Sequence, residues 1–389
     1  MKSAATTSRS TWTRFEIFSL PVFDKGAACD RLLLFLAVGL AAFGLVMVYS
    51  ASYILAQEKF GDGLWYFKKH IVFLLVGFSA MGFFRVFNHR LLEKAALPLF
   101  LLSLSLMLAT LVPGVGHKAG GASRWLRMWG LTMQPVEIAK LTTLMMLAAE
   151  FSRKDLAFDD WRQGFVYRLW PMGVFAAVSL LQPDFGSVAL VLAAGGMMFY
   201  LAGVRWRYLL GAAALALPAL AAVMVMAPYR RARLLSFLNP WADPQGAGFQ
   251  VIQSFLAFHR GGLFGVGLGN SRSKVFYLPE AHNDFILAVV GEELGFVGIA
   301  LLCGAFLLLF FRGVRVAAKS ASRFGALLAS GVIMLLGMQA FWNAAIVLGL
   351  FPTKGMTLPL ISSGGSSIVM ALSAVGILLN ISAQSAGDA

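Results

Sequence analysis

The chain has 389 residues, and its composition is that of a protein whose solvent is lipid. Hydrophobic residues make up 59% of it, charged residues only 13%, and the mean hydropathy is +0.77. Soluble domains carry about 25% charged residues, so a soluble enzyme, a disordered regulator and a disulfide-stapled secreted domain are excluded. The two cysteines, Cys29 and Cys303, lie far apart and form no metal-ligand or redox spacing. We therefore predict an all-α, polytopic integral membrane protein.

The net charge of +14 is distributed as membrane topology requires. No run of five basic residues occurs, and the lysines and arginines lie in short segments between apolar runs. We therefore expect no nucleic-acid partner. Residues 1–30 are polar, without the apolar stretch and cleavage site of a signal peptide, and are predicted to be a cytoplasmic tail.

Apolar runs long enough to cross a bilayer predict about ten membrane spans. In chain order they cover residues 32–56, 71–87, 95–112, 135–151, 169–181, 185–203, 208–227, 285–311, 324–350 and 366–382. With the N-terminus inside, the inner segments hold 18 lysines and arginines and the short outer loops hold 7. The positive-inside rule then predicts both termini in the cytoplasm. Residues 31–382 form one transmembrane domain, followed by a cytoplasmic tail at 383–389.

Residues 228–283 form the one sizeable segment outside the predicted spans, a large extracytoplasmic loop between spans 7 and 8. Within it, residues 249–259 predict a short amphipathic helix that lies on the membrane surface. The glycine-rich residues 265–269 lack the strand-turn-helix context of a nucleotide loop and are interpreted as flexible backbone. The arginines at 230, 231 and 233 are interpreted as solvated or facing lipid headgroups.

Polar residues at the ends of several predicted spans converge on the outer leaflet. Charged side chains near or inside a membrane are costly, so each of them needs a reason. The candidate site residues are Arg124, Glu137, Lys140, Asp184, Glu280, His282, Asp284, Glu292, Lys354 and Ser362. Carboxylates and cations delivered to one face by independent segments indicate a functional site more strongly than any single residue does.

Taken singly, these residues also have structural interpretations. Glu137 and Lys140, three residues apart on a helix, could neutralise each other. Asp184 could cap the following helix, and Glu292 could pair with a basic residue of a neighbouring helix. Asp284 has no basic residue within one helical turn, so it could be either a helix cap or a general base whose pKa is raised by apolar surroundings.

The chemistry that these residues suit is transfer from a lipid that carries its own leaving group. No nucleophile elbow, zinc signature, P-loop or kinase motif occurs, so the substrate must supply the energy. Cations at Arg124 and Lys140 suit a pyrophosphate, and a carboxylate could activate an attacking hydroxyl. A divalent cation, Mg²⁺ or Mn²⁺, could assist. The residues alone do not identify the sugar.

Five motifs, in order along the chain, resemble those of the SEDS family (shape, elongation, division and sporulation). They are Gly-Ala-Ser-Arg-Trp at 121–125, Gln-Pro-Val-Glu at 134–137 with Lys140, Leu-Pro-Glu-Ala-His-Asn-Asp-Phe at 278–285, Gly-Glu-Glu-Leu-Gly at 291–295 and Leu-Pro-Leu-Ile-Ser-Ser-Gly-Gly-Ser-Ser at 358–367. Glu-Ala-His at 280–282 and Pro-Thr-Lys-Gly-Met-Thr-Leu-Pro at 352–359 resemble the cell-division branch rather than the elongation branch. Ser363 departs from the family, in which a tyrosine is usual.

The resemblance implies a peptidoglycan glycosyltransferase that polymerises lipid II at the outer face of the cytoplasmic membrane, at the division septum, and releases undecaprenyl pyrophosphate. It implies Asp284 as the catalytic carboxylate and Arg124 and Lys140 as the cations that bind the pyrophosphate. The implied partners are a class B penicillin-binding transpeptidase (FtsI-like) and the divisome proteins FtsQ, FtsL and FtsB. A lipid II flippase, an elongation-type (RodA-like) polymerase and a non-catalytic division scaffold remain as alternatives.

Overall fold

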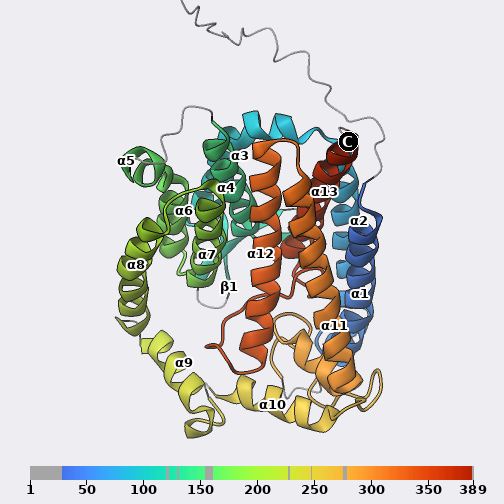
Figure 1. The fold of residues 1–389 in the computed structure, drawn as a ribbon. Helices are drawn as coiled ribbons and strands as arrows, with labels where there is room; N and C mark the ends of the chain where they lie inside the picture. Colours follow the sequence, from blue (N-terminus) through green and yellow to red (C-terminus); the bar gives the residue numbers. More distant parts are fainter. Residues whose placement is uncertain are drawn as a thin grey trace, which may run out of the picture.

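The computed structural model describes residues 29–119, 122–128, 131–153, 161–226, 228–246, 248–274 and 278–387. These ranges form a bundle of long helices that run along a common direction (Figure 1). Both ends of the described chain lie at one end of the bundle, where the backbone N–H of Asp30 donates to Ser382 Oγ at 3.0 Å. We call this end the terminal end. The opposite end, with α9 (Pro228–Leu238) and α10 (Phe249–Gly261), is called the loop end.

Ten helices of the described ranges overlap the ten predicted spans. They are α1 (Arg31–Phe60), α2 (Trp65–Val86), α3 (His89–Ala109), α4 (Pro135–Ser152), α6 (Trp170–Leu181), α7 (Phe185–Ala202), α8 (Trp206–Met226), α11 (Ile286–Lys319), α12 (Arg323–Val347) and α13 (Gly365–Gly387). Eight helical segments of the described chain are long and apolar enough to cross a membrane. The predicted class, a polytopic α-helical membrane protein, is confirmed, and the count of ten spans stays a prediction.

Local sequence signals set many of the helix ends. Asp30 caps α1 by accepting a hydrogen bond from the Leu33 N–H, and Ser322 caps α12 in the same way. Gly61 ends α1 in the left-handed conformation at φ 70°. A short helix, α5 (Trp161–Gly164), and a 3₁₀ turn, η2 (Val166–Arg168), precede α6.

The bundle is centred on α12 and α13, the two most deeply buried of the candidate spans. Small residues allow the central helices to approach closely. A Cβ atom at Gly376 of α13 would lie 2.6 Å from the Met81 carbonyl oxygen of α2, and one at Gly77 would lie 2.5 Å from the Leu372 side chain. A side chain at either glycine would therefore push α2 and α13 apart.

A three-stranded antiparallel sheet connects α3 to α4, in a region that we expected to be a loop. Its strands are β1 (Gly116–Ala119), β2 (Ala122–Met128) and β3 (Leu131–Met133), in the order β1-β2-β3. β2 pairs with both neighbours, so the backbone polar groups of this short outer segment find partners that an isolated loop would lack. Arg124 therefore lies on a strand, which gives it a fixed direction.

The predicted outer segment contains α9, a 3₁₀ turn, η3 (Pro240–Ala242), and α10. The predicted helix at 249–259 is confirmed, but its apolar face contacts protein. Val251, Ile252 and Ala257 are buried, and Ser254 Oγ donates to the Val347 carbonyl of α12 at 2.6 Å. The expectation that this face lies on the membrane is therefore wrong, because α10 packs across the ends of α11 and α12.

Candidate active site

Asp284 lies at the loop end, in the turn that leads into α11. Asn343 Nδ2 of α12 donates to the Asp284 carbonyl at 2.8 Å and to the Met356 carbonyl at 2.6 Å. Ser362 Oγ donates to the Asn283 carbonyl at 2.6 Å and accepts from the Leu358 N–H at 2.8 Å. The backbone of Asp284 is thus held between α12 and the segment 352–364, as a precisely placed carboxylate requires.

The side chain of Asp284 is aimed at a glycine and is free of partners in the part of the chain that the structure describes. A Cβ atom at Gly355 would lie 2.8 Å from Asp284 Oδ2. Among the described residues, Asp284 forms hydrogen bonds through its backbone and not through its carboxylate. The helix-cap interpretation is therefore not supported, and the carboxylate oxygens are available to a substrate hydroxyl.

The pKa of Asp284 is raised to about 7, chiefly by burial and in addition by the charge of Glu280, while the charge of Arg233 opposes the rise. A carboxylate with a pKa near the working pH is a suitable general base. Arg233 lies on α9, and its guanidinium donates to the Thr353 carbonyl at 3.4 Å. Arg233 is exposed, as the interpretation of a solvated residue expects, and this hydrogen bond also places it beside the segment that contains Lys354.

A second group, which we call the cation cluster, consists of Arg124, Glu137, Lys140, Asp184 and Lys354. Lys354 Nζ lies 3.0 Å from Asp184 Oδ1, and Lys140 Nζ lies 2.8 Å from Glu137 Oε1 and 3.3 Å from Gln339 Oε1. Arg124 donates through Nε and Nη2 to the carbonyls of Gln182 and Pro183, both at 2.7 Å. The ion pair between Glu137 and Lys140 that we considered is thus present.

The cation cluster retains one net positive charge, because its three cations face two carboxylates and Arg124 bonds only to carbonyls among the described residues. Burial lowers the pKa of Lys354, pairing with Asp184 opposes this, and the charges of Arg124 and Lys140 lower the pKa further. Burial alone would raise the pKa of Asp184, but Lys354, Ser187 and Arg124 hold it well below its usual range. Cations held this close together suit an anion such as a pyrophosphate.

Asp184 also performs the capping role that its position after a proline suggested. Its carboxylate accepts hydrogen bonds from the Ser187 N–H at 3.3 Å and from Ser187 Oγ at 2.7 Å, which caps α7. Lys354 reaches this carboxylate across Gly186, where a Cβ atom would lie 2.2 Å from Nζ. Since Lys354 is followed by Gly355, the two groups of the site are adjacent in the chain.

Glu280 and His282 precede Asp284 in the turn that leads into α11. His282 is buried, its ring centroid lies 4.3 Å from that of Tyr66, and its Nδ1 has no hydrogen-bond partner among the described residues. Burial lowers the pKa of His282, and the charge of Glu280 opposes this effect. Glu280 is exposed, and its carbonyl accepts from the N–H groups of Asn283 and Phe285.

Glu292 contacts the outer segment rather than the reactive groups. Its carboxylate accepts from Ser271 Oγ at 2.5 Å and from the Arg272 N–H at 3.1 Å, and lies 3.6 Å from Arg260. No group of three histidine, cysteine or acidic side chains suited to a metal occurs in the described ranges. Glu137 and Asp184 are already paired with lysines, so neither of these two carboxylates is free to hold a divalent ion.

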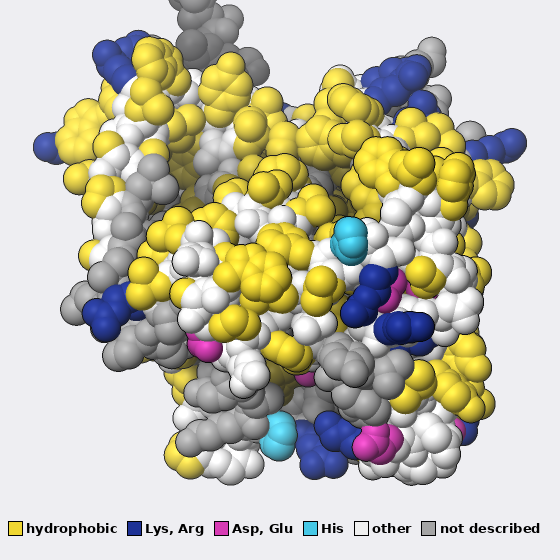
Figure 2. All heavy atoms as spheres, turned by 90° about the horizontal axis from the view of Figure 1, so that it is seen from below, with side chains coloured by type: hydrophobic (Ala, Val, Ile, Leu, Met, Phe, Trp, Pro, Cys, Tyr) yellow, Lys and Arg dark blue, Asp and Glu magenta, His cyan; other side chains and the backbone are white. Residues whose placement is uncertain are grey.

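Asn343, Gln339 and Gly355 were not expected at the site. Asn343 and Gln339 are amides within an otherwise apolar predicted span, which is itself a signal of function. Gly355 follows Lys354 directly, but a sequence does not show which side chain faces a glycine. The loop end as a whole presents lysines and arginines beside acidic side chains within a largely apolar surface (Figure 2).

The described residues form a bundle of apolar helices with an unpaired carboxylate and a cation cluster at one end, which is the architecture of an integral membrane protein. The sequence model of the FtsW, RodA and SpoVE family, described as cell cycle proteins, matches residues 30–387. This chain belongs to that family, as the resemblance to SEDS proteins predicted.

Curated relatives extend over nearly the whole chain. It is 45% identical over 360 residues to the probable peptidoglycan glycosyltransferase FtsW of Geobacter sp. (strain M18), covering 92% of this chain and 98% of that protein. It is 38% identical over 361 residues to the stage V sporulation protein E of Bacillus subtilis (strain 168), covering 93% and 99%.

Two solved structures share the fold. A chain from a peptidoglycan synthase complex, studied for its coordination of polymerization and crosslinking, superposes with a TM-score of 0.77 at 32% identity, covering 92% of this chain and 98% of that one. The rod shape determining protein RodA of Thermus thermophilus superposes with a TM-score of 0.68 at 28% identity, covering 91% and 96%. These likenesses confirm the predicted fold class.

Proposed function

We propose that this chain is a peptidoglycan glycosyltransferase of the cell-division type in which Asp284 is the general base. Family membership and the names of its relatives support the activity class. The observation that carries the site assignment is the Asp284 carboxylate, unpaired among the described residues, with a pKa raised to about 7 and next to the segment that supplies Lys354. The substrate is lipid II, a disaccharide peptide on undecaprenyl pyrophosphate.

The reaction is an inverting transfer between two lipid II-type molecules. Asp284 accepts the proton of the acceptor GlcNAc 4-hydroxyl, and the oxygen attacks the anomeric carbon of the donor MurNAc. The bond from that carbon to the pyrophosphate breaks, and undecaprenyl pyrophosphate leaves with its negative charge stabilised by Arg124, Lys140 and Lys354. General-base catalysis supplies about 10²–10⁴-fold, and stabilisation of the leaving group supplies a comparable factor.

The loop end is the extracytoplasmic face in this proposal. The excess of lysine and arginine in the other short segments supports it, and Asp30 and Ser382 place both ends of the described chain together at the terminal end. The protein then lies in the cytoplasmic membrane with both termini inside, and acts at the division septum. The FtsW-type relatives favour this role over an elongation-type polymerase.

A lipid II flippase is the competing function. Transport needs a polar path along the whole bundle, whereas Glu137, Lys140, Asp184 and Asp284 all lie toward one end of it. The test uses the purified protein in sealed vesicles with labelled lipid II, supplied with a transpeptidase partner. We expect glycan polymer to form from lipid II in the leaflet that the loop end faces, without transfer between leaflets. Transfer between leaflets without polymer would support the flippase instead.

The pH dependence of the reaction reports on Asp284. We expect kcat/KM to rise with pH through a midpoint near 7, because only the deprotonated carboxylate accepts a proton. Glu280→Gln removes a negative charge that raises this pKa, so the midpoint moves to lower pH. Rates measured from about pH 5 to about pH 9 check this. A midpoint that stays in place or moves upward in Glu280→Gln would contradict the assignment.

Gly355 keeps the space in front of Asp284 open. We expect Gly355→Ala to lower the polymerisation rate about 10²-fold, because the new methyl group meets Oδ2 and a displacement of about 1 Å has that cost. Gly304→Ala, with open space around its Cβ position, is the matched control. Rates are compared after the two variants show equal thermal stability. A fully active Gly355→Ala enzyme would show that Asp284 does not act from the observed position.

An apolar groove between α11 and α12 is the proposed docking site for the membrane helix of the class B (FtsI-like) transpeptidase. Its volume is about 460 Å³, and Leu302, Phe306, Gly337, Ala340 and Ala344 are among its lining residues. The small residues are spaced along one face of α12, as helix pairs in membranes require. The chain of similar fold from a complex that coordinates polymerization and crosslinking also supports a crosslinking partner. FtsQ, FtsL and FtsB complete the proposed assembly.

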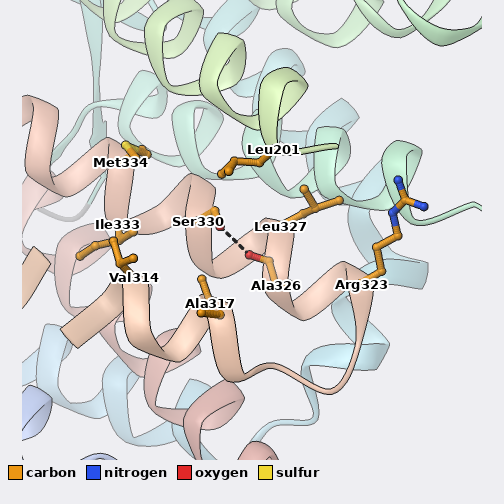
Figure 3. Close-up of a pocket in the computed structure, with 10 residues that line it drawn as sticks. Leu201, Val314, Ala317, Arg323, Ala326, Leu327, Ser330, Ile333 and Met334 are labelled. Atoms are coloured by element: carbon orange, nitrogen blue, oxygen red, sulfur yellow. Dashed lines mark hydrogen bonds between the residues drawn. The ribbon is translucent and has the colours of Figure 1, made fainter. Parts of the chain in front are cut away.

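Filling this groove should weaken the complex. We expect Ala344→Trp to lower the affinity for the transpeptidase at least about tenfold, since overpacking costs about 1–3 kcal/mol. Ala326→Trp is the control, because it fills a second apolar pocket of about 350 Å³ at the terminal end of α12, beside Leu327 and Leu201 (Figure 3). Affinities measured in detergent check the prediction, and equal loss in both variants would contradict it.

A further inference from the structure

Helix α11 is interrupted at Gly295, where the backbone adopts φ 65° and ψ −164°. The backbone groups of α11 that lose their helical partners at the break form hydrogen bonds with residues 262–267, which belong to the outer segment. The N–H groups of Val266 and Gly267 donate to the carbonyls of Glu292 and Glu293, both at 3.0 Å. In return, the N–H groups of residues 296 and 297 donate to the carbonyls of residues 262 and 263, at 2.9 and 3.1 Å. We call residues 262–268 the latch segment.

Glycines make this close contact possible. A Cβ atom at Gly265 would lie 2.1 Å from the Glu293 carbonyl oxygen, and one at Gly295 would lie 2.4 Å from the Gly265 nitrogen. Both residues have positive φ, which glycine adopts without strain. The glycine-rich run 265–269 therefore includes a structural joint, and its interpretation as flexible backbone is wrong.

Buried side chains reinforce the joint. Glu293 accepts from Ser50 Oγ of α1 at 2.7 Å and pairs with Lys274 at 3.0 Å. The Glu292 carboxylate accepts hydrogen bonds from Ser271 Oγ and from the backbone N–H groups of Arg272 and Ser273. The short helical part 286–294, which begins two residues after Asp284, is therefore bound to the outer segment at the end that precedes Gly295.

From helix length we infer that the break lies at the outer edge of the membrane, which moves the membrane-crossing part of α11 toward the terminal end of the predicted span 285–311. The part of α11 from 296 to 319 spans about 36 Å at 1.5 Å per residue, enough to cross a hydrocarbon core of about 30 Å. Arg315 and Lys319 are exposed near its terminal end, where cations meet the inner interface. Counting about 30 Å outward from Arg315 reaches Phe296, the residue after the break.

The latch segment presents apolar side chains at this level. Leu263 is 65% exposed, Phe264 81% and Leu268 56%. The backbone bonds place them beside the outward face of α11, where Phe296 is 63% and Leu301 72% exposed. These side chains continue the lipid-facing surface of a candidate span. In water they would form an exposed apolar patch, whereas aromatic and aliphatic side chains at the interface are stabilised by lipid.

We propose that Leu263, Phe264 and Leu268 insert into the outer leaflet and thereby anchor the helical part 286–294 that follows Asp284. The partner of this surface is the lipid itself. The anchor holds whether or not Asp284 is a general base, so its test needs no activity assay.

The depth of Phe264 in a bilayer tests the proposal. A nitroxide is placed at Phe264→Cys, with Cys29 and Cys303 replaced by serine, and the protein is reconstituted in nanodiscs of phosphatidylethanolamine and phosphatidylglycerol. Leu301→Cys is the lipid-facing control and Asp243→Cys is the control in the outer segment. We expect collisions with oxygen to exceed those with nickel–EDDA at 264, as at 301. Access to nickel–EDDA equal to that at 243, or protection from both reagents, would overturn the insertion.

A second measurement tests the anchoring. Hydrogen exchange of the amides at 266, 267, 296 and 297 is followed in the same nanodiscs. We expect Phe264→Ser to speed their exchange about tenfold, which corresponds to about 1.4 kcal/mol. Phe35→Ser, at an exposed position of α1 remote from the latch segment, should leave them unchanged. Unchanged exchange in Phe264→Ser, or an equal effect in Phe35→Ser, would show that lipid contact does not hold the joint.

Discussion

Asp284→Asn should reduce glycan polymerisation by about 10²–10⁴-fold while the protein remains folded, because an amide cannot accept the proton of the attacking hydroxyl. Asparagine has the same shape, and the side chain of Asp284 makes no hydrogen bond within the described residues that the change would break. The loss should therefore appear in kcat rather than in the melting temperature. Polymer from labelled lipid II, resolved on a gel, gives the rate.

The matched control for this variant is Asp243→Asn. Asp243 is an exposed carboxylate of the same outer segment, outside both groups of the site. We expect it to retain wild-type activity. Equal polymer from wild type and Asp284→Asn would reduce Asp284 to a structural residue of the turn before α11.

Lys354→Met has the second largest expected effect, because it acts on catalysis and on stability together. Loss of a positioned cation at the leaving group should cost about 10²–10³ in kcat. The same change leaves Asp184 buried without its cation, which destabilises by about 3–5 kcal/mol. Lys319→Met, which removes an exposed cation at the terminal end, is the control. Polymerisation and thermal unfolding are measured on the same preparations.

The double variant Lys354→Met with Asp184→Asn separates the two effects. Removing the charge of Asp184 should restore most of the stability, because no unpaired carboxylate remains buried. Activity should stay low, since the cation that we propose for the pyrophosphate is still absent. Recovery of both stability and activity would show that Lys354 serves only to pair with Asp184.

Much of this architecture is predictable from the chain because lipid imposes simple rules. Long apolar runs must become helices, and so ten of the described helices, α1–α4, α6–α8 and α11–α13, overlap the predicted spans. Charged residues near membrane segments are costly, and the residues chosen on that ground, Lys140, Asp184 and Lys354 among them, do come together with Arg124 at the loop end. The ion pair of Glu137 with Lys140 follows from helical spacing alone.

Features that depend on long-range contacts were not predictable. The strand that carries Arg124 pairs with neighbours of only a few residues, too short for a clear alternating pattern. The break at Gly295 is stabilised by hydrogen bonds to a glycine-rich segment about 30 residues earlier in the chain. The local pattern of apolar residues around Gly295 therefore predicts one continuous helix. The sequence does not distinguish Arg233 from the nearby Arg230 and Arg231. Only the packing of α9 places Arg233 beside Thr353.

The central claim is that Asp284 accepts the proton in a polymerisation reaction. The most direct measurement compares wild type and Asp284→Asn, each with the transpeptidase partner, for binding of labelled lipid II and for release of undecaprenyl pyrophosphate. We predict equal binding, with release and glycan polymer in wild type alone. Release by Asp284→Asn at the wild-type rate would contradict the assignment of the base, and absence of polymer from a folded wild-type complex would contradict the proposed transferase.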